Sequence, residues 1–248
     1  MITTTQIITN DFIDIHCHII PCVDDGSKSF EESLFYLKQA QKKGIKRIIC
    51  TPHIVDCNID RIKLIKNNFL HLKDFALKCG IELYLGTEIM LTFNTLELFK
   101  KNKMRSLNGS KYILIEVKRN EKMDVEDLIY SIEELKLLGY IPILAHPELY
   151  KYYRNIDIIK RIKEMGILLQ MDCTSILRKT SSKRVYRFSK KLLKEKLIDF
   201  VASDSHCTKN RNFKSYKKAY NKIKRKYGKD YSNALFKYNP SVIFEENI

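Results

Sequence analysis

Short apolar runs rich in β-branched residues alternate along the chain with longer stretches of helical periodicity. Short runs bounded by glycine, proline or polar residues predict buried strands, whereas apolar residues spaced three and four apart predict helices. Seven strands are expected, at residues 11–19, 46–51, 81–88, 112–116, 141–145, 167–172 and 199–203. Helices are expected at residues 29–43, 60–79, 94–101, 124–138, 155–165, 183–196, 213–227 and 231–237.

This order of strands and helices predicts an α/β protein. Repeated strand–helix units imply parallel strands joined by right-handed crossovers, and both an open doubly wound sheet and a barrel fit that pattern. No Gly-x-Gly-x-x-Gly motif follows the first strand, so a dinucleotide-binding fold has no support. No linker or low-complexity segment divides the chain, and we therefore expect residues 1–248 to form a single domain.

The composition is that of a globular protein. Of the 248 residues, 44% are hydrophobic and 30% are charged, and glycine and proline are scarce. No apolar run is long enough to span a bilayer, and the start of the chain, Met1–Thr5, lacks the features of a signal peptide. The seven cysteines show no Cys-x-x-Cys spacing, which argues against a disulfide framework or a zinc finger. We expect a cytoplasmic protein with no transmembrane segment.

The formal net charge of +16 allows three kinds of partner: nucleic acid, an anionic membrane surface or a phosphorylated substrate. The basic residues are densest at 178–196 and 209–229. Neither an aromatic-interleaved RNA-binding signature nor a helix-turn-helix pattern accompanies them, so we expect no nucleic-acid partner. The basic helices could dock a partner or a membrane, or simply be solvated.

Two histidines mark the end of the first strand. Side chains alternate across a strand, so His16 and His18 are expected on the same face, where both imidazoles can bind one metal ion. The turn that follows brings the carboxylate of Asp25 to the same end.

The other strands also end in potential metal ligands. Because the carboxyl ends of strands in a barrel converge on one face, these side chains are expected to meet there. They are His53, Glu88, Glu116, His146, Asp204 and His206. Only His71 among the six histidines falls within a helix, and it is expected to be structural.

Nine such side chains on one face would be electrostatically costly without cations between them. Nitrogen and oxygen donors without thiolate favour manganese, iron or zinc, and nine donors suit two or three ions. Neighbouring metal ions can activate water and bind the oxygens of a phosphoryl group, so phosphate-ester hydrolysis is the first expectation. Amide or ring hydrolysis on an amidohydrolase-like barrel is the alternative.

The segment from Ile13 to Ser27 resembles the opening of the PHP (polymerase and histidinol phosphatase) superfamily. More narrowly, it resembles the manganese-dependent protein-tyrosine phosphatases encoded with bacterial capsule and exopolysaccharide genes. The resemblance extends over nearly the whole chain, to about Asn239-Pro240, through motifs at the family's spacing. These are Thr51-Pro52-His53, Gly86-Thr87-Glu88, Leu114-Ile115-Glu116, Ala145-His146-Pro147-Glu148 and Ala202-Ser203-Asp204-Ser205-His206.

The resemblance implies a distorted seven-stranded (β/α) TIM-like barrel, the PHP fold, with a site for three metal ions. The central pair would be bound by His16, His18, Glu88, Glu116, His146 and Asp204. The third ion would be bound by Asp25, His53 and His206. Glu88 would be the bridging carboxylate, Asp25 rather than Asp24 would be the ligand, and Arg211 would hold phosphate.

At one position the sequence departs from this family. The family usually has His-Pro-Glu-Arg-Tyr after the fifth strand, with the arginine contacting phosphate, whereas this chain has Leu149 there. Leucine cannot donate a side-chain hydrogen bond, and losing a charged hydrogen bond from a transition state costs roughly 2–4 kcal/mol. Lys151 or Arg154 could substitute for the missing arginine.

The resemblance implies a metal-dependent phosphomonoesterase acting on phosphotyrosine in a protein. In the family the substrate is the tyrosine-rich tail of a membrane-associated polysaccharide-export kinase, and such an acidic partner suits the charge of +16. Two alternatives stay open. One is a small-molecule PHP phosphatase, for example for histidinol phosphate, and the other is a non-catalytic phosphotyrosine-binding barrel.

Overall fold

The computed structural model describes residues 11–54, 58–101, 104–119, 124–208 and 211–247. Met1–Thr5, on which the expected absence of a signal peptide rests, lies outside these ranges. Within them, no helix is long and apolar enough to cross a membrane. The cysteines of the described ranges are all free, as their spacing predicts.

The strands confirm an α/β fold with parallel pairing throughout the described residues. They form a three-stranded sheet of order β1-β2-β4 and a six-stranded sheet of order β3-β5-β6-β7-β8-β9. Their bounds are β1 (Phe12–Cys17), β2 (Ile45–Cys50), β3 (His53–Ile54), β4 (Glu82–Leu85), β5 (Glu88–Met90), β6 (Tyr112–Glu116), β7 (Ile141–Ala145), β8 (Leu168–Asp172) and β9 (Phe200–Ala202).

The described chain thus has nine strand segments where seven were expected. The expected strand 81–88 is interrupted, and the short strand β3 follows the end of the expected strand 46–51. Pro52 has no N–H to donate to a ladder, and it separates β2 from β3. Gly86 separates β4 from β5 and lies so close to Leu107 that a Cβ there would be 2.7 Å from the leucine Cδ2. The backbone N–H of Gly86 still donates to the Cys50 carbonyl at 2.8 Å, so the chain through β2 and β3 stays beside the chain through β4 and β5.

Backbone contacts also join the end of β1 to the segment after β9. Cys17 and Ser205 form an isolated parallel bridge. The N–H of His18 donates to the Ser205 carbonyl at 2.8 Å, and the N–H of Asp204 donates to the His16 carbonyl at 2.9 Å. The first and last strands therefore meet at their carboxyl ends.

The helices agree with the predicted ranges to within a few residues at each end. Ser29 caps the first helix as expected, since its side chain accepts a hydrogen bond from the Glu32 N–H. The helices are α1 (Phe30–Lys42), α2 (Ile59–Lys78), α3 (Phe93–Lys100), α4 (Val125–Leu137), α5 (Ile156–Glu164), α6 (Lys183–Lys194), α7 (Lys214–Tyr227), α8 (Lys229–Asn233) and α9 (Asn239–Ser241). Shorter turns are η1 (Leu107–Gly109), η2 (Pro147–Leu149), η3 (Lys151–Tyr153), η4 (Cys173–Ile176), η5 (Ala234–Tyr238) and η6 (Val242–Asn247).

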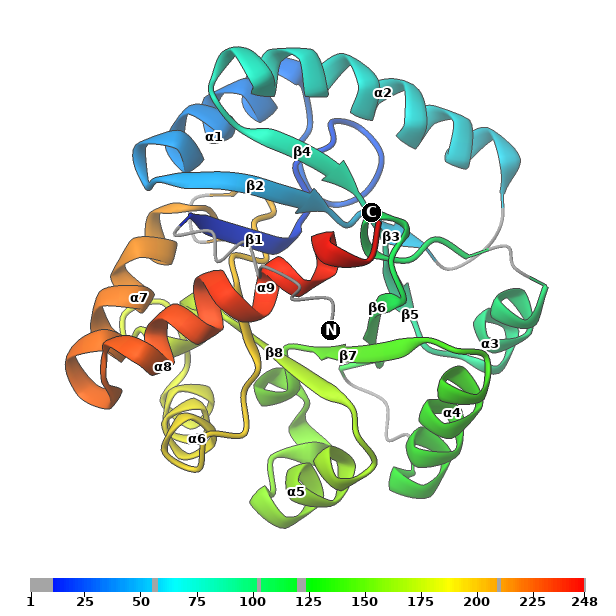
Figure 1. The fold of residues 1–248 in the computed structure, drawn as a ribbon, viewed down its shortest axis with the longest axis vertical. Coiled ribbons are helices and arrows are strands. Elements are labelled where there is room, and N and C mark those ends of the chain that lie inside the picture. The colour runs from blue at the N-terminus through cyan, green and yellow to red at the C-terminus, as the bar shows by residue number, and fades with distance from the viewer. Residues whose placement is uncertain (1–10, 55–57, 102–103, 120–123, 209–210, 248) are drawn as a thin grey trace, which may run out of the picture.

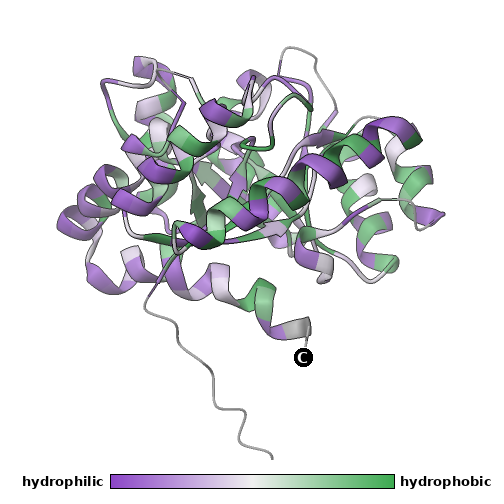
Figure 2. Cartoon of the chain, turned by 90° about the horizontal axis from the view of Figure 1, so that it is seen from above, coloured by the Kyte–Doolittle hydropathy of each residue, from purple (hydrophilic) through white to green (hydrophobic). Residues whose placement is uncertain are grey.

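The strands surround the centre of the molecule and helices α1 to α7 surround the strands, while α8 and α9 cross one face (Figure 1). Hydrophobic positions gather toward the strands and hydrophilic ones on the outer helix surfaces (Figure 2). The larger apolar cluster lies between strands and helices. A smaller inner cluster includes Ile13, Leu114 and Phe200, which come from β1, β6 and β9.

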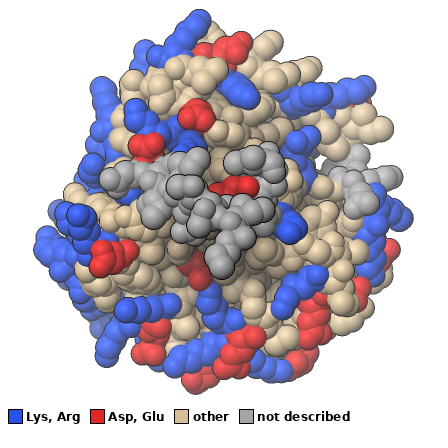
Figure 3. Space-filling view, viewed as in Figure 1, with Lys and Arg blue, Asp and Glu red and all other residues tan. Residues whose placement is uncertain are grey.

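Charged side chains are scattered among uncharged ones on the face seen in Figure 3. On the face seen in Figure 3, Lys and Arg lie around the edge and are mixed with acidic residues over α4 and α5. Such mixing is typical of a solvated surface.

The C-terminal segment holds β1 in place through an aromatic cluster. Phe236 is fully buried and packs edge-on against Phe12, Tyr216 and Tyr220, at ring-centroid distances of 6.4, 5.0 and 5.6 Å. The Tyr216 hydroxyl donates to the Ile13 carbonyl at 2.5 Å. These contacts fix the strand that carries His16.

Truncating this cluster should destabilise the protein strongly. Phe236→Ala removes a buried aromatic side chain, so we expect the free energy of unfolding to fall by about 3–5 kcal/mol in urea denaturation. Phe93 is 75% exposed. Phe93→Ala is therefore the matched control, expected to change stability by less than about 0.5 kcal/mol. Equal effects of the two variants would contradict this account of the core.

Candidate metal centre

The structure brings all nine predicted donors together at the carboxyl ends of the strands. They form four overlapping groups, and within each group the candidate ligand atoms lie within 4.8 Å of one another. The groups are His18, Asp25, His53 and His206; His16, His18 and Asp204; His16, Glu88 and His146; and His53, Glu88 and Glu116. His71 lies on the exposed surface of α2, apart from these groups, as expected.

His16 and His18 point their Nε2 atoms at each other across 3.2 Å, which confirms that they share a face. The Nδ1 of His16 donates to Gln170 Oε1 at 2.8 Å, and the Nδ1 of His18 donates to Asp24 Oδ2 at 2.8 Å. Because each Nδ1 carries a proton, each Nε2 is free to present its lone pair. Two lone pairs this close require a proton or a metal ion between them.

A second layer of side chains fixes the His16 ring. Gln170 lies in the middle of buried strand β8, and its amide nitrogen donates to Asp172 Oδ1 at 3.2 Å. That bond turns the Gln170 oxygen toward His16. Buried Glu148 in turn accepts from the Asp172 N–H at 3.0 Å, and burial raises the pKa of Glu148 to about 7.

Glu88 belongs to two of the four groups, and the family resemblance implies a bridging carboxylate at this residue. Its Oε2 is 3.2 Å from the Nε2 of both His16 and His18 and 3.1 Å from the His53 Nδ1. Its Oε1 is 2.9 Å from the His146 Nε2. The Glu88 Oε2 and the Asp204 Oδ1 are buried and have no hydrogen-bond partner. Such orphaned carboxylate oxygens are costly unless a cation binds them.

Charges within the site shift several pKa values. Burial opposes protonation of His16, but Glu88 and Asp204 outweigh it and raise the pKa of His16 to about 10. Burial likewise opposes protonation of His53, while hydrogen bonding to Glu116 and the charge of Glu88 raise its pKa to about 9. Burial raises the pKa of Glu88, but the neighbouring histidines lower it well below its usual value. The carboxylates therefore attract positive charge, which a divalent cation can supply in place of protons.

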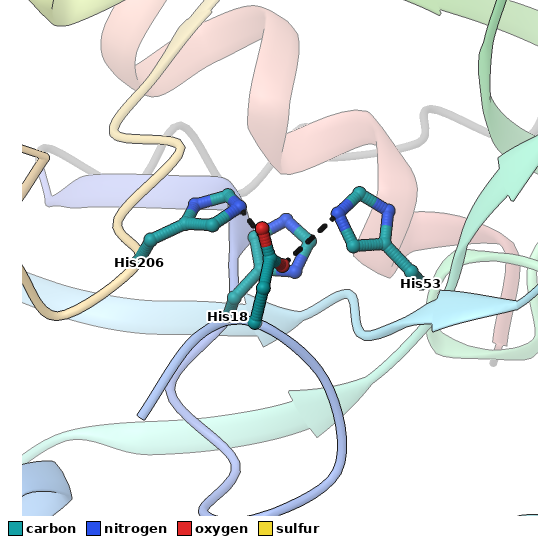
Figure 4. Close-up of side chains that lie close together, drawn as sticks. His18, His53 and His206 are labelled. Carbon is teal, nitrogen blue, oxygen red and sulfur yellow. Dashed lines mark ion pairs between the residues drawn. The ribbon is translucent and has the colours of Figure 1, made fainter. Parts of the chain in front are cut away.

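A more open part of the site contains Asp25. The side chain of Asp25 is 66% exposed, and its Oδ1 is 3.4 Å from the Nε2 of both His53 and His206. The rings of His18, His53 and His206 point toward this carboxylate (Figure 4). Asp25, His53 and His206, which were expected to share one ion, thus lie together, and His18 belongs to the same group.

The adjacent Asp24 positions other groups instead of joining a cluster of donors. It accepts hydrogen bonds from His18 Nδ1, from the Gly26 N–H at 2.9 Å and from the His53 N–H at 3.2 Å. A Cβ at Gly26 would lie 2.1 Å from the His18 carbonyl oxygen, so only glycine allows this tight loop.

Two donors sit on left-handed backbone, which is unfavourable for residues other than glycine. The φ angles of His146 and Asp204 are +35° and +45°. Buried Asp14 stabilises the second of these turns, since it accepts from the Ser203 N–H at 2.8 Å and from the Ser203 hydroxyl at 2.5 Å. Strained backbone of this kind is concentrated at functional sites.

A pocket of about 260 Å³ opens beside the donors, and two arginines line it. Arg211 pairs with Asp204, so the residue expected to hold phosphate lies within the site. Arg119 follows Glu116 by three residues, and its Nη2 is 3.4 Å from the His146 Nε2. No carboxylate of the described residues pairs with Arg119. The remaining lining residues are Asp25, His53, Met90, Glu116, Val117 and His206.

Leu149 lies half-buried in η2, and its expected substitutes lie elsewhere. Lys151 and Arg154 line a different pocket, between η3 and α6, and neither lines the pocket beside the donors. The idea that one of them supplies the missing guanidinium or ammonium group there is therefore not supported.

Sequence reasoning missed Arg119, Gln170 and the positioning role of Asp24. A polar Gln170 within the buried run Leu168–Asp172 was a usable signal, because a buried amide needs specific partners. The other usable signal was the position of Arg119, three residues beyond the strand that ends in the donor Glu116.

The chain is an α/β protein with candidate metal ligands clustered at the ends of parallel strands. Residues 12–245 match the family model described as capsular polysaccharide synthesis, CpsB/CapC. The tyrosine-protein phosphatase YwqE of Bacillus subtilis is 35% identical over 219 residues, covering 84% of this chain and 82% of the relative. The tyrosine-protein phosphatase CpsB of Streptococcus pneumoniae is 31% identical over 246 residues, covering 95% of this chain and 99% of the relative.

A crystal structure from work on these two proteins, described as unique metal-dependent tyrosine phosphatases, has the same fold. It matches with a TM-score of 0.84 and 29% identity, covering 95% of each chain. The chain therefore belongs to the CpsB/CapC family. The resemblance drawn from the sequence motifs is confirmed.

Removing the Gln170 hydrogen bond should weaken metal binding. Gln170→Leu keeps the side-chain size but frees the His16 ring, and second-layer changes of this kind typically cost about 10–100-fold in metal affinity. Manganese titration of the metal-free protein measures the effect. Gln41→Leu, on the exposed surface of α1, is the control and should bind as the wild type does. A folded Gln170→Leu variant with wild-type affinity would show that His16 needs no such support.

Proposed function

We propose that this protein is a metal-dependent phosphomonoesterase that hydrolyses phosphotyrosine in a protein substrate. The observation that carries the proposal is the convergence of nine nitrogen and oxygen donors beside a pocket lined by two arginines. The relatives named tyrosine-protein phosphatases support the choice of substrate.

We propose that the site holds two or three divalent ions, manganese in preference to iron or zinc. His16, His18, Glu88, Glu116, His146 and Asp204 would bind a central pair, and Asp25, His53 and His206 a third ion. The four overlapping donor groups and the orphaned oxygens of Glu88 and Asp204 support this assignment. When bound, such ions supply water of lowered pKa for attack on phosphorus and stabilise the charge that develops.

The chain's own residues would orient the substrate. Arg211 and Arg119 present guanidinium groups to one pocket, and two such groups can hold the oxygens of a phosphate. Arg119 would thereby provide the contact that Leu149 cannot. A phenolate leaving group, with a pKa of about 10, needs less general-acid help than an alkoxide. The site can therefore act on phosphotyrosine without a dedicated acid.

The proposed partner is a membrane-associated tyrosine kinase of polysaccharide synthesis that carries a phosphotyrosine tail. The family's description as capsular polysaccharide synthesis and the net charge of +16 support it. We also propose a cytoplasmic location, which the free cysteines of the described ranges support.

We further propose that residues 1–248 form a single PHP phosphatase domain built on a distorted seven-stranded barrel. Counting β2 with β3 and β4 with β5 as single interrupted strands gives seven. Contacts between β1 and the segment after β9, and an inner cluster drawn from both sheets, support closure.

Metal removal should abolish activity. We expect phosphate release from a phosphotyrosyl peptide with added manganese, and none after chelation, because the donors alone provide no nucleophile. His16→Ala/His18→Ala should behave as the chelated protein does, while His71→Ala should remain active. Preferred turnover of histidinol phosphate would favour the small-molecule alternative. Tight peptide binding without turnover by metal-loaded protein would favour a binding role.

Replacing Arg119 should weaken phosphate binding in particular. Arg119→Ala should lower kcat/KM for the peptide by about 10–100-fold, the effect of losing one charged hydrogen bond. Weaker inhibition by inorganic phosphate should accompany it, and Arg119→Lys should recover part of both. The neighbouring Lys118 is exposed, and Lys118→Ala serves as the control. Unchanged kinetics in Arg119→Ala would remove this residue from the mechanism.

A further inference from the structure

A second pocket, of about 470 Å³, lies between η3 and α6 and is lined almost entirely by cationic side chains. Nothing in the proposed chemistry uses it. Its lining residues are Lys151, Arg154, Arg184, Arg187, Phe188 and Lys191.

Helical geometry explains why α6 contributes three of these cations. Arg184, Arg187 and Lys191 are spaced three and four residues apart, so they share one face of the helix. Leu192 and Leu193 are buried against the rest of the protein. Phe188 is 9% exposed and gives the pocket an apolar wall.

The cations of this pocket have no acidic partners among the described residues. No ion pair within the described ranges involves any of the five, whereas nearby surface residues are paired, as in Lys160–Glu195 at 3.3 Å. Arg154 is half-buried, and its Nε is buried without a hydrogen-bond partner. Like charges gathered without counter-charges repel each other, and an anionic ligand would relieve that repulsion.

A short stretch of chain connects the pocket to the candidate metal centre. His146 is followed directly by η2 and then by η3, which supplies Lys151, and Arg154 follows η3. η2 also contacts α6. A polypeptide with one residue at the metal centre could therefore place a neighbouring residue in this pocket.

We propose that the pocket binds a second phosphorylated tyrosine of the polypeptide substrate while the first occupies the metal centre. Guanidinium groups pair with phosphate through two parallel hydrogen bonds, and they can stack on the aromatic ring of a tyrosine. The phenyl ring of Phe188, which lines the pocket, can pack against the same ring. The apolar wall of Phe188 and the position of the pocket between two elements favour a side chain over a membrane surface. The inference rests on the proposed phosphatase function and names the substrate class as multiply phosphorylated tyrosine segments.

The test compares wild type with Arg184→Glu/Arg187→Glu on p-nitrophenyl phosphate, a singly phosphorylated tyrosyl peptide and a doubly phosphorylated one. We expect wild type to show a KM for the doubly phosphorylated peptide about tenfold below that for the singly phosphorylated peptide. The variant should lose this difference. Its kcat, and its turnover of p-nitrophenyl phosphate, should match those of wild type.

A matched control separates the pocket from general electrostatics. Lys224→Glu/Arg225→Glu makes the same charge change on the exposed surface of α7, and its KM values should match those of wild type. The inference would be overturned if both variants lost the KM difference between the two peptides to the same extent. It would also be overturned if wild type had equal KM values for the two peptides. Lost binding to phosphatidylserine vesicles in Arg184→Glu/Arg187→Glu with unchanged peptide KM would overturn it as well, since the pocket would then serve a membrane.

The same assays distinguish this inference from the proposed function. A wild-type protein that hydrolyses none of the three substrates with manganese present contradicts the phosphatase proposal itself. If wild type hydrolyses all three substrates and Arg184→Glu/Arg187→Glu leaves the KM values unchanged, only the second binding pocket is contradicted.

Discussion

The repulsion among buried carboxylates at the strand ends is the constraint on which the rest of the structure depends. Glu88 and Asp204 are almost completely buried, and each has an oxygen with no hydrogen-bond partner. Imidazoles surround them, and the nearby carboxylates raise the pKa values of His16 and His53. Such an arrangement is stable only with positive charge between the carboxylates, and divalent ions supply it in the geometry that the donors already have.

The surrounding framework exists to hold these donors in one arrangement. Left-handed backbone at His146 and Asp204, and the glycine required at position 26, are locally unfavourable and need support from neighbouring elements. Asp14 and Asp24 provide it by accepting hydrogen bonds from backbone N–H groups. Gln170, within strand β8, supports the His16 imidazole by accepting a hydrogen bond from its Nδ1. Each of these polar groups is itself satisfied by the groups it supports.

The sequence predicted most of the helices and the whole donor set, because periodicity and strand-end position are local signals. His16 and His18 required only the alternation of side chains along a strand. The end of the second strand before Pro52 was predicted, but the short strand β3 after it and the interruption at Gly86 were not. The close approach of Leu107 to Gly86 joins distant parts of the chain, which local patterns do not reveal. Arg119 was missed for the same reason. Its importance comes from its nearness to His146, 27 residues away.

The meeting of β1 with the segment after β9 also affects how the protein is made. Ser203 bonds to Asp14 and to the His16 carbonyl across separations of 189 and 187 residues. During synthesis the N-terminal histidines therefore leave the ribosome long before Asp204 and His206 are available. Contacts this distant in sequence slow folding and expose early strands to aggregation. Assembly of the complete set of donors must await synthesis of the segment after β9, and the aromatic cluster around Phe236 is completed later still.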